Sequence, residues 1–408
     1  MKTLKAYYNL PNDVIFCKKC VLSNQRPASV PEFKHKRNRD GANYLNIDKF
    51  GVCDACNYHV SKAKEINWEK REKELSILLD KYRRNDGSYD CMVPGSGGKD
   101  SAYQAHVLKY KYGMHPLTIT WPPIMYTDYG YNNWKNWLDS GFDNITFTRN
   151  GKVMKLLTRL SIENLLHPFQ TFIFGQYNLA PKLAVKYDIP LIFYGETASD
   201  YGNPIIESSQ SLRSKSYHSY NKLAEIYLAG MPIQEILEQY DLELVDIMPF
   251  LPITDEELTK SDIKIIALGY YLKWIPQEIY YYAVENTNFK ARPFRTQGTY
   301  SKYNSIDDKI DDLHYYTTFI KFGIGRATYD ASQEIRNKHL TREEGQALVN
   351  RFEGEFPGRY FDEVMEYIEM KPDRFHELCD EFRSPHLWKK EKGKWKLRHT
   401  VNLDGTDD

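Results

Sequence analysis

A glycine-rich stretch at residues 93–101 has the residue types and spacing to hold a phosphate group. It reads Val-Pro-Gly-Ser-Gly-Gly-Lys-Asp-Ser, follows the apolar run 89–93 and opens a helix-like segment at 102–111. A strand, a glycine turn and a helix in this order point backbone N–H groups at an anion and let it approach closely. A Walker loop is excluded, because it needs Ser or Thr directly after its Lys, whereas Asp100 follows Lys99 here. The structural alternative is an ordinary turn between a strand and a helix.

The six residues Ser-Gly-Gly-Lys-Asp-Ser at 96–101 resemble the PP-loop of the ATP pyrophosphatases. Proteins with this loop bind pyrophosphate and split ATP into AMP and pyrophosphate, a chemistry that makes adenylated intermediates. The resemblance implies contacts to ATP or pyrophosphate from Gly95, Ser96, Gly97, Gly98, Lys99, Asp100, Ser101 and Gly195.

Charged side chains at this loop suggest a division of roles. Asp100 is placed to bind the Mg²⁺ that accompanies ATP, and Lys99 to neutralise charge on the leaving pyrophosphate. Glu196 follows the apolar run 189–194, so we expect it at a strand end, as a second magnesium ligand or as a carboxylate that orients the substrate. Its alternative is a glutamate at a helix N-terminus. Lys99, Asp100 and Glu196 are the candidate catalytic residues, and residues 200–202 are expected to reach the acceptor.

Four of the six cysteines form two Cys-x-x-Cys pairs, Cys17 with Cys20 and Cys53 with Cys56. Two such turns can complete a tetrahedral zinc site. Disulfides are not expected in the cytosol, so structural Zn²⁺ is favoured over unpaired core cysteines. A four-thiolate site is closed, and it would hold the N-terminal module together without doing chemistry. The two remaining cysteines, at positions 91 and 379, are predicted to be buried core residues.

The composition is that of a globular protein without a strong charge bias. The 408 residues predict two or three domains, and 55 basic residues balance 55 acidic ones. The missing basic excess argues against tRNA or another nucleic acid as substrate. Because no apolar run reaches the length of a membrane span and the first eight residues lack a signal core, we expect a cytoplasmic protein with no membrane partner.

Strand and helix signals alternate from residue 89 onward. This alternation predicts an α/β fold with a doubly wound parallel sheet and a ligand at the carboxyl ends of its strands. We expect a zinc-binding module at 1–60, a PP-loop domain at 61–275 that begins with a linking helix at 61–85, and a mainly helical C-terminal domain at 276–408. The expected strands are 91–93, 116–121, 144–148, 189–194 and 263–268.

Two C-terminal segments combine arginine and hydroxyl side chains suited to a sugar or a phosphate. The segment 294–301 contains Arg295 and Thr299, and the segment 321–328 contains Arg326. Each is explained equally well as a turn with a structural arginine. The same region is predicted to form helices at 277–285, 343–352 and 361–370 and a basic hairpin at 388–398.

Taken together, these motifs resemble the N-acetyl sugar amidotransferases, the WbpG-like and PseA-like proteins of O-antigen and pseudaminic acid biosynthesis. The likeness rests on the segments 17–21, 51–56, 94–101, 184–196, 320–328 and 382–388. Two departures are the long insertion at 34–50 and the Thr-Ala-Ser at 197–199, where an Asn-containing stretch is expected.

This resemblance implies a HUP-like PP-loop fold and an amidine-forming reaction. ATP would activate the oxygen of an N-acetyl group on a nonulosonic acid or another lipopolysaccharide sugar, and ammonia would then displace AMP to leave an acetamidino group. Because the chain offers no candidate glutaminase nucleophile, ammonia would come from a partner glutaminase, with a barrel-type channelling subunit, or from free ammonium. Two alternatives stay open: a PP-loop enzyme of tRNA thiolation, and a non-catalytic nucleotide-binding scaffold of a glycan pathway.

Overall fold

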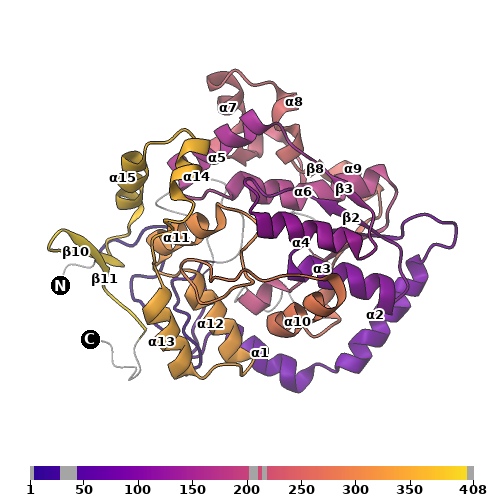
Figure 1. The fold of residues 1–408 in the computed structure, drawn as a ribbon, viewed down its shortest axis with the longest axis horizontal. Coiled ribbons are helices and arrows are strands. Elements are labelled where there is room, and N and C mark those ends of the chain that lie inside the picture. Colours follow the sequence, from indigo (N-terminus) through magenta and orange to yellow (C-terminus); the bar gives the residue numbers. More distant parts are fainter. Residues whose placement is uncertain (1–3, 28–43, 202–209, 214–217, 402–408) are drawn as a thin grey trace.

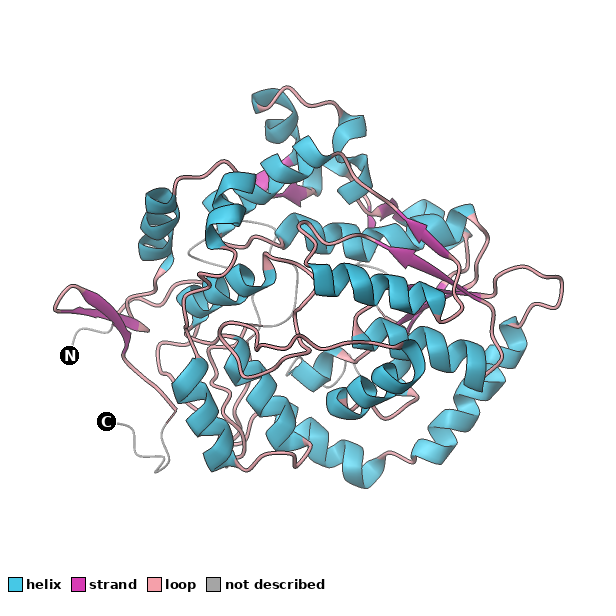
Figure 2. Ribbon diagram, viewed as in Figure 1, coloured by secondary structure: helices cyan, strands magenta, loops and turns pink. Residues whose placement is uncertain are grey.

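A five-stranded parallel sheet forms the centre of the protein (Figures 1 and 2). The computed structural model describes residues 4–27, 44–201, 210–213 and 218–401. The strands lie in the order β3-β2-β1-β4-β9, and every neighbouring pair is parallel. Their bounds are β1 Cys91–Pro94, β2 Pro116–Thr120, β3 Asn144–Thr146, β4 Leu191–Tyr194 and β9 Lys264–Ala267. All five predicted strands are therefore present, in a mixed α/β fold.

Helices cover both faces of this sheet. Because successive side chains of a strand point to opposite faces, Met92 of β1 packs with α5 (Gly151–Leu165) and α6 (Gln170–Lys186). Its neighbours Cys91 and Val93 face the other way and join a second core. That core is completed by α2 (Trp68–Tyr82), α3 (Lys99–His106), α4 (Asp128–Asp139) and α10 (Pro276–Thr287). In Figure 1 the first group lies above the sheet and the second below it.

The predicted single linking helix at 61–85 is wrong at its start. The structure has two helices here, α1 (Asp54–Glu65) and α2, and α1 begins inside the predicted zinc module. The break falls at Asn67, whose side chain accepts a hydrogen bond from the backbone N–H of Lys70 and so caps α2. The boundaries proposed at residues 60 and 275 stay predictions.

The segment between β4 and β9 contains short elements that the sequence did not indicate. Two-residue strands pair locally, β5 with β8 and β6 with β7, beside small helices on the α6 side of the sheet. The elements are η2 Ala198–Tyr201, β5 Ser219–Tyr220, η5 Leu223–Glu225, β6 Tyr227–Leu228, β7 Met231–Pro232, α7 Ile233–Gln239, α8 Leu244–Ile247, η6 Met248–Phe250, β8 Ile253–Thr254 and α9 Asp255–Lys260. A further short helix, η7 Leu268–Tyr270, follows β9 directly.

The C-terminal region is mainly helical, as predicted, and ends in a hairpin around Gly393. In the described part of the chain, no helix combines the length and apolar character needed to cross a membrane. The elements are α11 Asp311–Phe322, α12 Arg326–Arg336, α13 Arg342–Phe352, α14 Phe361–Tyr367, α15 Pro372–Phe382, β10 Trp388–Glu391 and β11 Lys394–Leu397.

The N-terminal segment lies against residues 382–386 near the other end of the chain. The buried hydroxyl of Tyr8 donates to the backbone oxygen of Phe382 at 2.6 Å, and the backbone N–H of Tyr7 donates to Ser384 Oγ at 2.9 Å. His386 is bonded through Nδ1 to Ser384 Oγ at 2.6 Å and through Nε2 to Gln25 Oε1 at 2.9 Å. The segment that carries the first cysteine pair is thus fixed by the far end of the chain.

Candidate functional site

The glycine-rich loop connects β1 to α3 at the carboxyl edge of the sheet. The backbone N–H of Gly95 still bonds to the β2 oxygen of Ile119 at 2.9 Å, and Gly98 caps α3, which begins at Lys99. Gly97 has φ +82°, and a Cβ there would lie 2.5 Å from the backbone of Trp134. Both the left-handed conformation and this close approach require glycine. A short π-helical turn, Val107–Lys111, extends α3.

The charges at the loop are arranged as a close pair. Lys99 Nζ lies 2.5 Å from Asp100 Oδ2, and the side chains are 10% and 40% exposed. Ser101 is buried, and its hydroxyl donates to the Gly98 oxygen at 3.0 Å. A phosphate bound at the start of α3 would take Lys99 as its partner, and a cation would take Asp100. Separation of the pair would free one positive and one negative group for such ligands.

Glu196 joins this group from β4, two residues beyond the end of that strand. Burial raises the pKa of Glu196, and the neighbouring Asp100 carboxylate raises it further. Two carboxylates that repel one another in this way suit a divalent cation, which removes the repulsion when it binds between them. Gly195 holds the turn close to Trp274, because a Cβ there would lie 2.7 Å from the indole ring. The structure thus places all three candidate catalytic residues at one edge of the sheet, as their strand-end positions predicted.

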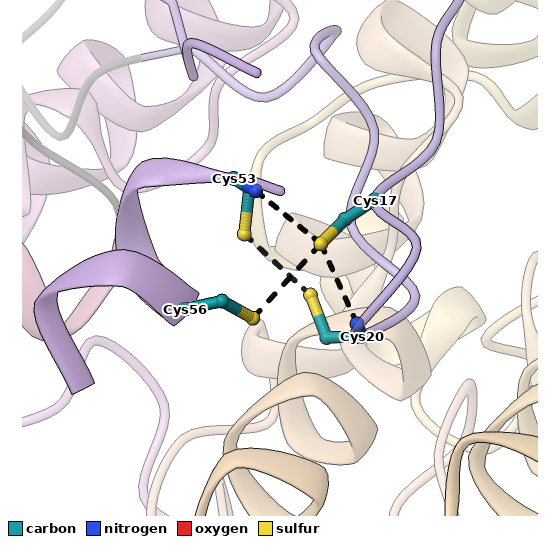
Figure 3. A group of neighbouring side chains, drawn as sticks. All are labelled: Cys17, Cys20, Cys53 and Cys56. Atoms are coloured by element: carbon teal, nitrogen blue, oxygen red, sulfur yellow. Dashed lines mark hydrogen bonds between the residues drawn. The ribbon is translucent and has the colours of Figure 1, made fainter. Parts of the chain in front are cut away.

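The four paired cysteines converge on one point, each sulfur facing the other three (Figure 3). Their sulfur atoms all lie within 4.8 Å of one another and are buried. The sulfur atoms of Cys17 and Cys56 are 3.9 Å apart, and those of Cys20 and Cys53 are 3.7 Å apart. A tetrahedral zinc with Zn–S bonds of about 2.3 Å would separate its sulfurs by about 3.8 Å. The cluster is therefore compatible with structural zinc.

The electrostatics of the cluster also favour a cation. Hydrogen bonding to Cys20 lowers the pKa of Cys17, whereas hydrogen bonding to Cys17 raises the pKa of Cys56. The first thiolate to form thus makes the others harder to ionise, as expected for like charges in a buried site. Backbone N–H groups of Lys19 and Cys53 each donate to Cys17 Sγ at 3.3 Å, which stabilises one thiolate only. Four thiolates require a positive ion at their centre.

Helix α1 links the cysteine cluster to the loop that follows Glu196. It begins directly after Cys53, and Lys62 near its end binds Asp200 at 2.7 Å. The Tyr58 hydroxyl lies 3.5 Å from Thr197 Oγ1, which donates to Asp200 at 2.8 Å. An acceptor that binds Asp200 would have to compete with Lys62, so the acceptor role of Asp200 stays a prediction. Residue 202, which was included in the same prediction, lies outside the described residues. The sequence did not predict the ion pair between Lys62 and Asp200, because no feature of the sequence distinguishes Lys62 from the other lysines of its helix.

The predicted substrate-binding residues are engaged in structural contacts. Arg295 forms a two-point ion pair with Glu355 at 2.5 and 2.8 Å. Thr299 donates to Asp330 at 2.7 Å, and Arg326 Nε lies 3.0 Å from the other oxygen of that carboxylate. The fold therefore brings the two C-terminal segments together around Asp330. A ligand at Arg295 would have to compete with Glu355, so its binding role stays a prediction.

The two cysteines outside the cluster are core residues, as expected. Cys91 is 0% exposed and Cys379 is 2% exposed. Burial raises the pKa of Cys91 well above its usual value and raises that of Cys379 to about 12. Neither thiol is positioned or ionised as a reactive sulfur would be.

Comparison with known proteins adds a family match at the C-terminus. Residues 297–402 match the C-terminal domain of WbpG-like LPS biosynthesis proteins. The match includes Thr299 and Arg326 and begins two residues after Arg295. This region of the chain is thus similar to proteins of lipopolysaccharide biosynthesis.

Other similarities are partial. An uncharacterized protein of Methanocaldococcus jannaschii, MJ1599, is 38% identical over 53 residues, which are 13% of this chain and 19% of that protein. The chain therefore spans about a fifth of that relative's length. The NMN synthetase from Francisella tularensis aligns over 56% of this chain and 99% of its own, with 13% identity and a TM-score of 0.25. A score this low does not establish a common fold.

Proposed function

We propose that the protein is an ATP-dependent amidotransferase with a doubly wound PP-loop fold that acts on a sugar of a bacterial surface glycan. It converts an N-acetyl group to an acetamidino group and releases AMP and pyrophosphate. The observation that carries the proposal is the occurrence of two features in one chain. A glycine cradle with Lys99, Asp100 and Glu196 around it suits ATP, and a C-terminal region similar to WbpG-like LPS biosynthesis proteins points to a glycan pathway.

The reaction follows from what these side chains can do. The amide oxygen attacks the α-phosphorus of ATP, an O–P bond forms, and pyrophosphate leaves from the cradle at the start of α3. Lys99 and the backbone N–H groups of the loop stabilise the charge that grows on the leaving group. Ammonia then attacks the imidoyl carbon, AMP departs with the former amide oxygen, and one proton is lost to leave the amidine. Asp100 and Glu196 would hold Mg²⁺, which supplies charge neutralisation on the phosphates.

The remaining partners follow from the chemistry of the chain. Both non-cluster cysteines are buried, so ammonia is expected from a separate glutaminase, with or without a channelling subunit, or from free ammonium. The same burial disfavours tRNA thiolation, because a sulfur carrier must be accessible and easily ionised. Zn²⁺ held by Cys17, Cys20, Cys53 and Cys56 is assigned a structural role.

Mass spectrometry of N-acetyl sugars incubated with the protein, ATP, Mg²⁺ and ammonium tests this function. The expected product carries NH in place of one oxygen and forms together with equal amounts of AMP and pyrophosphate. The Asp100→Asn variant should lower AMP formation by at least about 100-fold, because it removes a charge from the reacting centre. The exposed Asp139→Asn variant on α4 serves as the control. AMP formation with tRNA but with no sugar would support thiolation, and absence of any ATP turnover with a glutaminase present would support the scaffold.

A further inference from the structure

A cavity of about 350 Å³ opens beside Glu196, on the side of that residue toward α1. None of the loop residues 95–101 lines it, so it is separate from the phosphate cradle and adjoins it through Glu196. Its walls come from five parts of the chain. These are helix α1, the first residue of α2 (Trp68), the loop after β4 with Glu196 and Asp200, residues 273–276 at the start of α10, and the C-terminal end of α12 with the residues after it.

The lining of this cavity is strongly basic. Lys62 and Arg336 lie in its inner part, and Lys273 and Lys338 are exposed at its rim. Two carboxylates, Glu196 and Asp200, offset only part of this charge. A concave site lined mainly by one sign of charge concentrates ligands of the opposite sign.

The two inner cations differ in how far the described residues satisfy their hydrogen-bond donors. Lys62 is paired with Asp200. Arg336 donates through Nη2 to the backbone oxygen of Asp200 at 3.0 Å, but its Nη1 atom is buried with no hydrogen-bond partner among the described residues. A buried guanidinium donor without a partner is costly, and an oxyanion is the group that would satisfy it best.

The potential inside the cavity is also felt by His59 of α1. Burial lowers the pKa of His59, and the positive charges of Arg336 and Lys62 lower it further. The imidazole is therefore kept neutral next to the cations, where it can accept or donate a hydrogen bond. The indole of Trp274 and the side chain of Trp68 supply apolar walls.

We propose that this cavity is a second anion site, in which Arg336, Lys273 and Lys338 hold the phosphate or carboxylate group of a ligand next to the ATP cradle. Two sources of such an anion fit the proposed function, on which this part of the inference rests. One is the pyrophosphate that leaves the cradle, held on its way out. The other is an acidic group of the sugar acceptor, whose N-acetyl group would then point past Glu196 toward the α-phosphate.

Calorimetric titration with inorganic pyrophosphate tests the site without requiring turnover. The wild-type protein should bind two equivalents, one in the cradle and one in the cavity. Gly97→Ala should remove the first. The double variant Lys273→Gln with Lys338→Gln changes two exposed rim residues and should fold normally. It should weaken pyrophosphate binding in the cavity by about tenfold or more, and Arg336→Gln, deeper in the cavity, should have the same effect. Lys64→Gln, an exposed residue of α1 outside the cavity, is the matched control.

A parallel titration with N-acetylneuraminate, a sugar with both a carboxylate and an N-acetyl group, separates the two sources. Loss of pyrophosphate binding alone in the rim variant supports an exit site, and loss of N-acetylneuraminate binding alone supports an acceptor site. If both anions bind the rim variant and Arg336→Gln as tightly as they bind Lys64→Gln, the anion site is disproved. Failure of the proposed function would instead appear as an absence of AMP formation with these titrations unchanged.

Discussion

The cysteine cluster and the glycine cradle at 95–101 have similar local structure but differ in how open they are to solvent. Each places some of its functional groups at the start of a helix: Cys53 and Cys56 at the start of α1, and Lys99 and Asp100 at the start of α3. In the cluster every sulfur is buried and faces another sulfur. In the cradle the groups remain partly exposed, and the Asp100 side chain is 40% accessible. A closed set of ligands suits a permanent ion, whereas an open set suits a substrate that must enter and leave.

The two sites are nevertheless connected through helix α1. Helix α1 starts in the cluster, and Lys62 in its last turn binds Asp200 of the loop that follows Glu196. The closed site therefore positions part of the open one. This comparison predicts that damage to the cluster spreads to the cradle, while damage to the cradle leaves the cluster intact.

Metal removal should have the largest effect. Structural zinc sites of this kind contribute on the order of 10 kcal/mol to the folding of their module. A strong chelator, or Cys17→Ser with Cys53→Ser, should lower the melting temperature and abolish ATP turnover, because α1 loses its anchor. Differential scanning fluorimetry and metal analysis measure this. Full activity in metal-free protein would show that the cradle does not depend on the cysteine cluster.

A methyl group at the cradle should abolish function with a smaller loss of stability. Gly97→Ala would place a Cβ 2.5 Å from the Trp134 backbone and strain a left-handed residue. We expect a destabilisation of about 2 to 4 kcal/mol and at least about a 100-fold loss of kcat/KM, since small displacements of reacting groups are costly. The control is Gly87→Ala, which has the same backbone conformation at φ +84° but open space around it. Zinc content should be unchanged in both variants, and a loss of zinc in Gly97→Ala would contradict the one-way dependence.

Acid should weaken the contact between the N-terminal segment and residues 384–386. Burial lowers the pKa of His386 to about 4, so this imidazole is neutral where it holds Gln25. A histidine whose pKa is lower in the folded state than in the unfolded state makes its full contribution to stability above the unfolded-state pKa, which is near 6.5. That contribution is lost as pH falls from about 6.5 to 4, and it amounts to about 3 kcal/mol. Urea unfolding at pH 7 and pH 4.5 should show a smaller pH effect in His386→Gln than in the control His339→Gln, an exposed histidine. Equal pH effects in the two variants would show that His386 does not contribute to the pH dependence of stability.

The link between the sites should give the smallest effect. Lys62→Met removes the partner of Asp200 in a pair whose side chains are 9% and 20% exposed. We expect a loss of about 2 kcal/mol in stability and a fall in kcat of about tenfold with bound zinc retained. Lys64→Met on the same helix is exposed and should leave both quantities near their wild-type values. Unchanged turnover in Lys62→Met would show that the cradle does not depend on α1.

Local signals in the sequence predicted the parts of this structure that local residues determine. The five strands, the glycine loop before α3 and the pairing of Cys17 and Cys20 with Cys53 and Cys56 all depend on short runs with a clear pattern. The strand-end position of Glu196 was enough to place it near Asp100, because parallel strands share their carboxyl edge.

The features that the sequence did not indicate depend on residues far apart in the chain. Glu355 and Asp330, which lie 60 and 31 positions away, form hydrogen bonds with Arg295 and Thr299, and no local pattern marks these contacts. The basic cavity is built from α1, the start of α2, the loop after β4, the start of α10 and the end of α12, so no single segment of the sequence indicates it. Two-residue strands such as β5 and β6 are too short to show alternation in the sequence.

The contact between Gln25 and His386 has a consequence for synthesis of the chain. The two residues are 361 positions apart, so at translation rates of 5 to 20 residues per second the first waits roughly 20 to 70 s for the second. During that time the N-terminal segment must keep its four thiols from oxidising and its apolar side chains from aggregating. All four thiols are available once residue 56 has emerged, so an ion captured then would give this segment a folded state in which to wait.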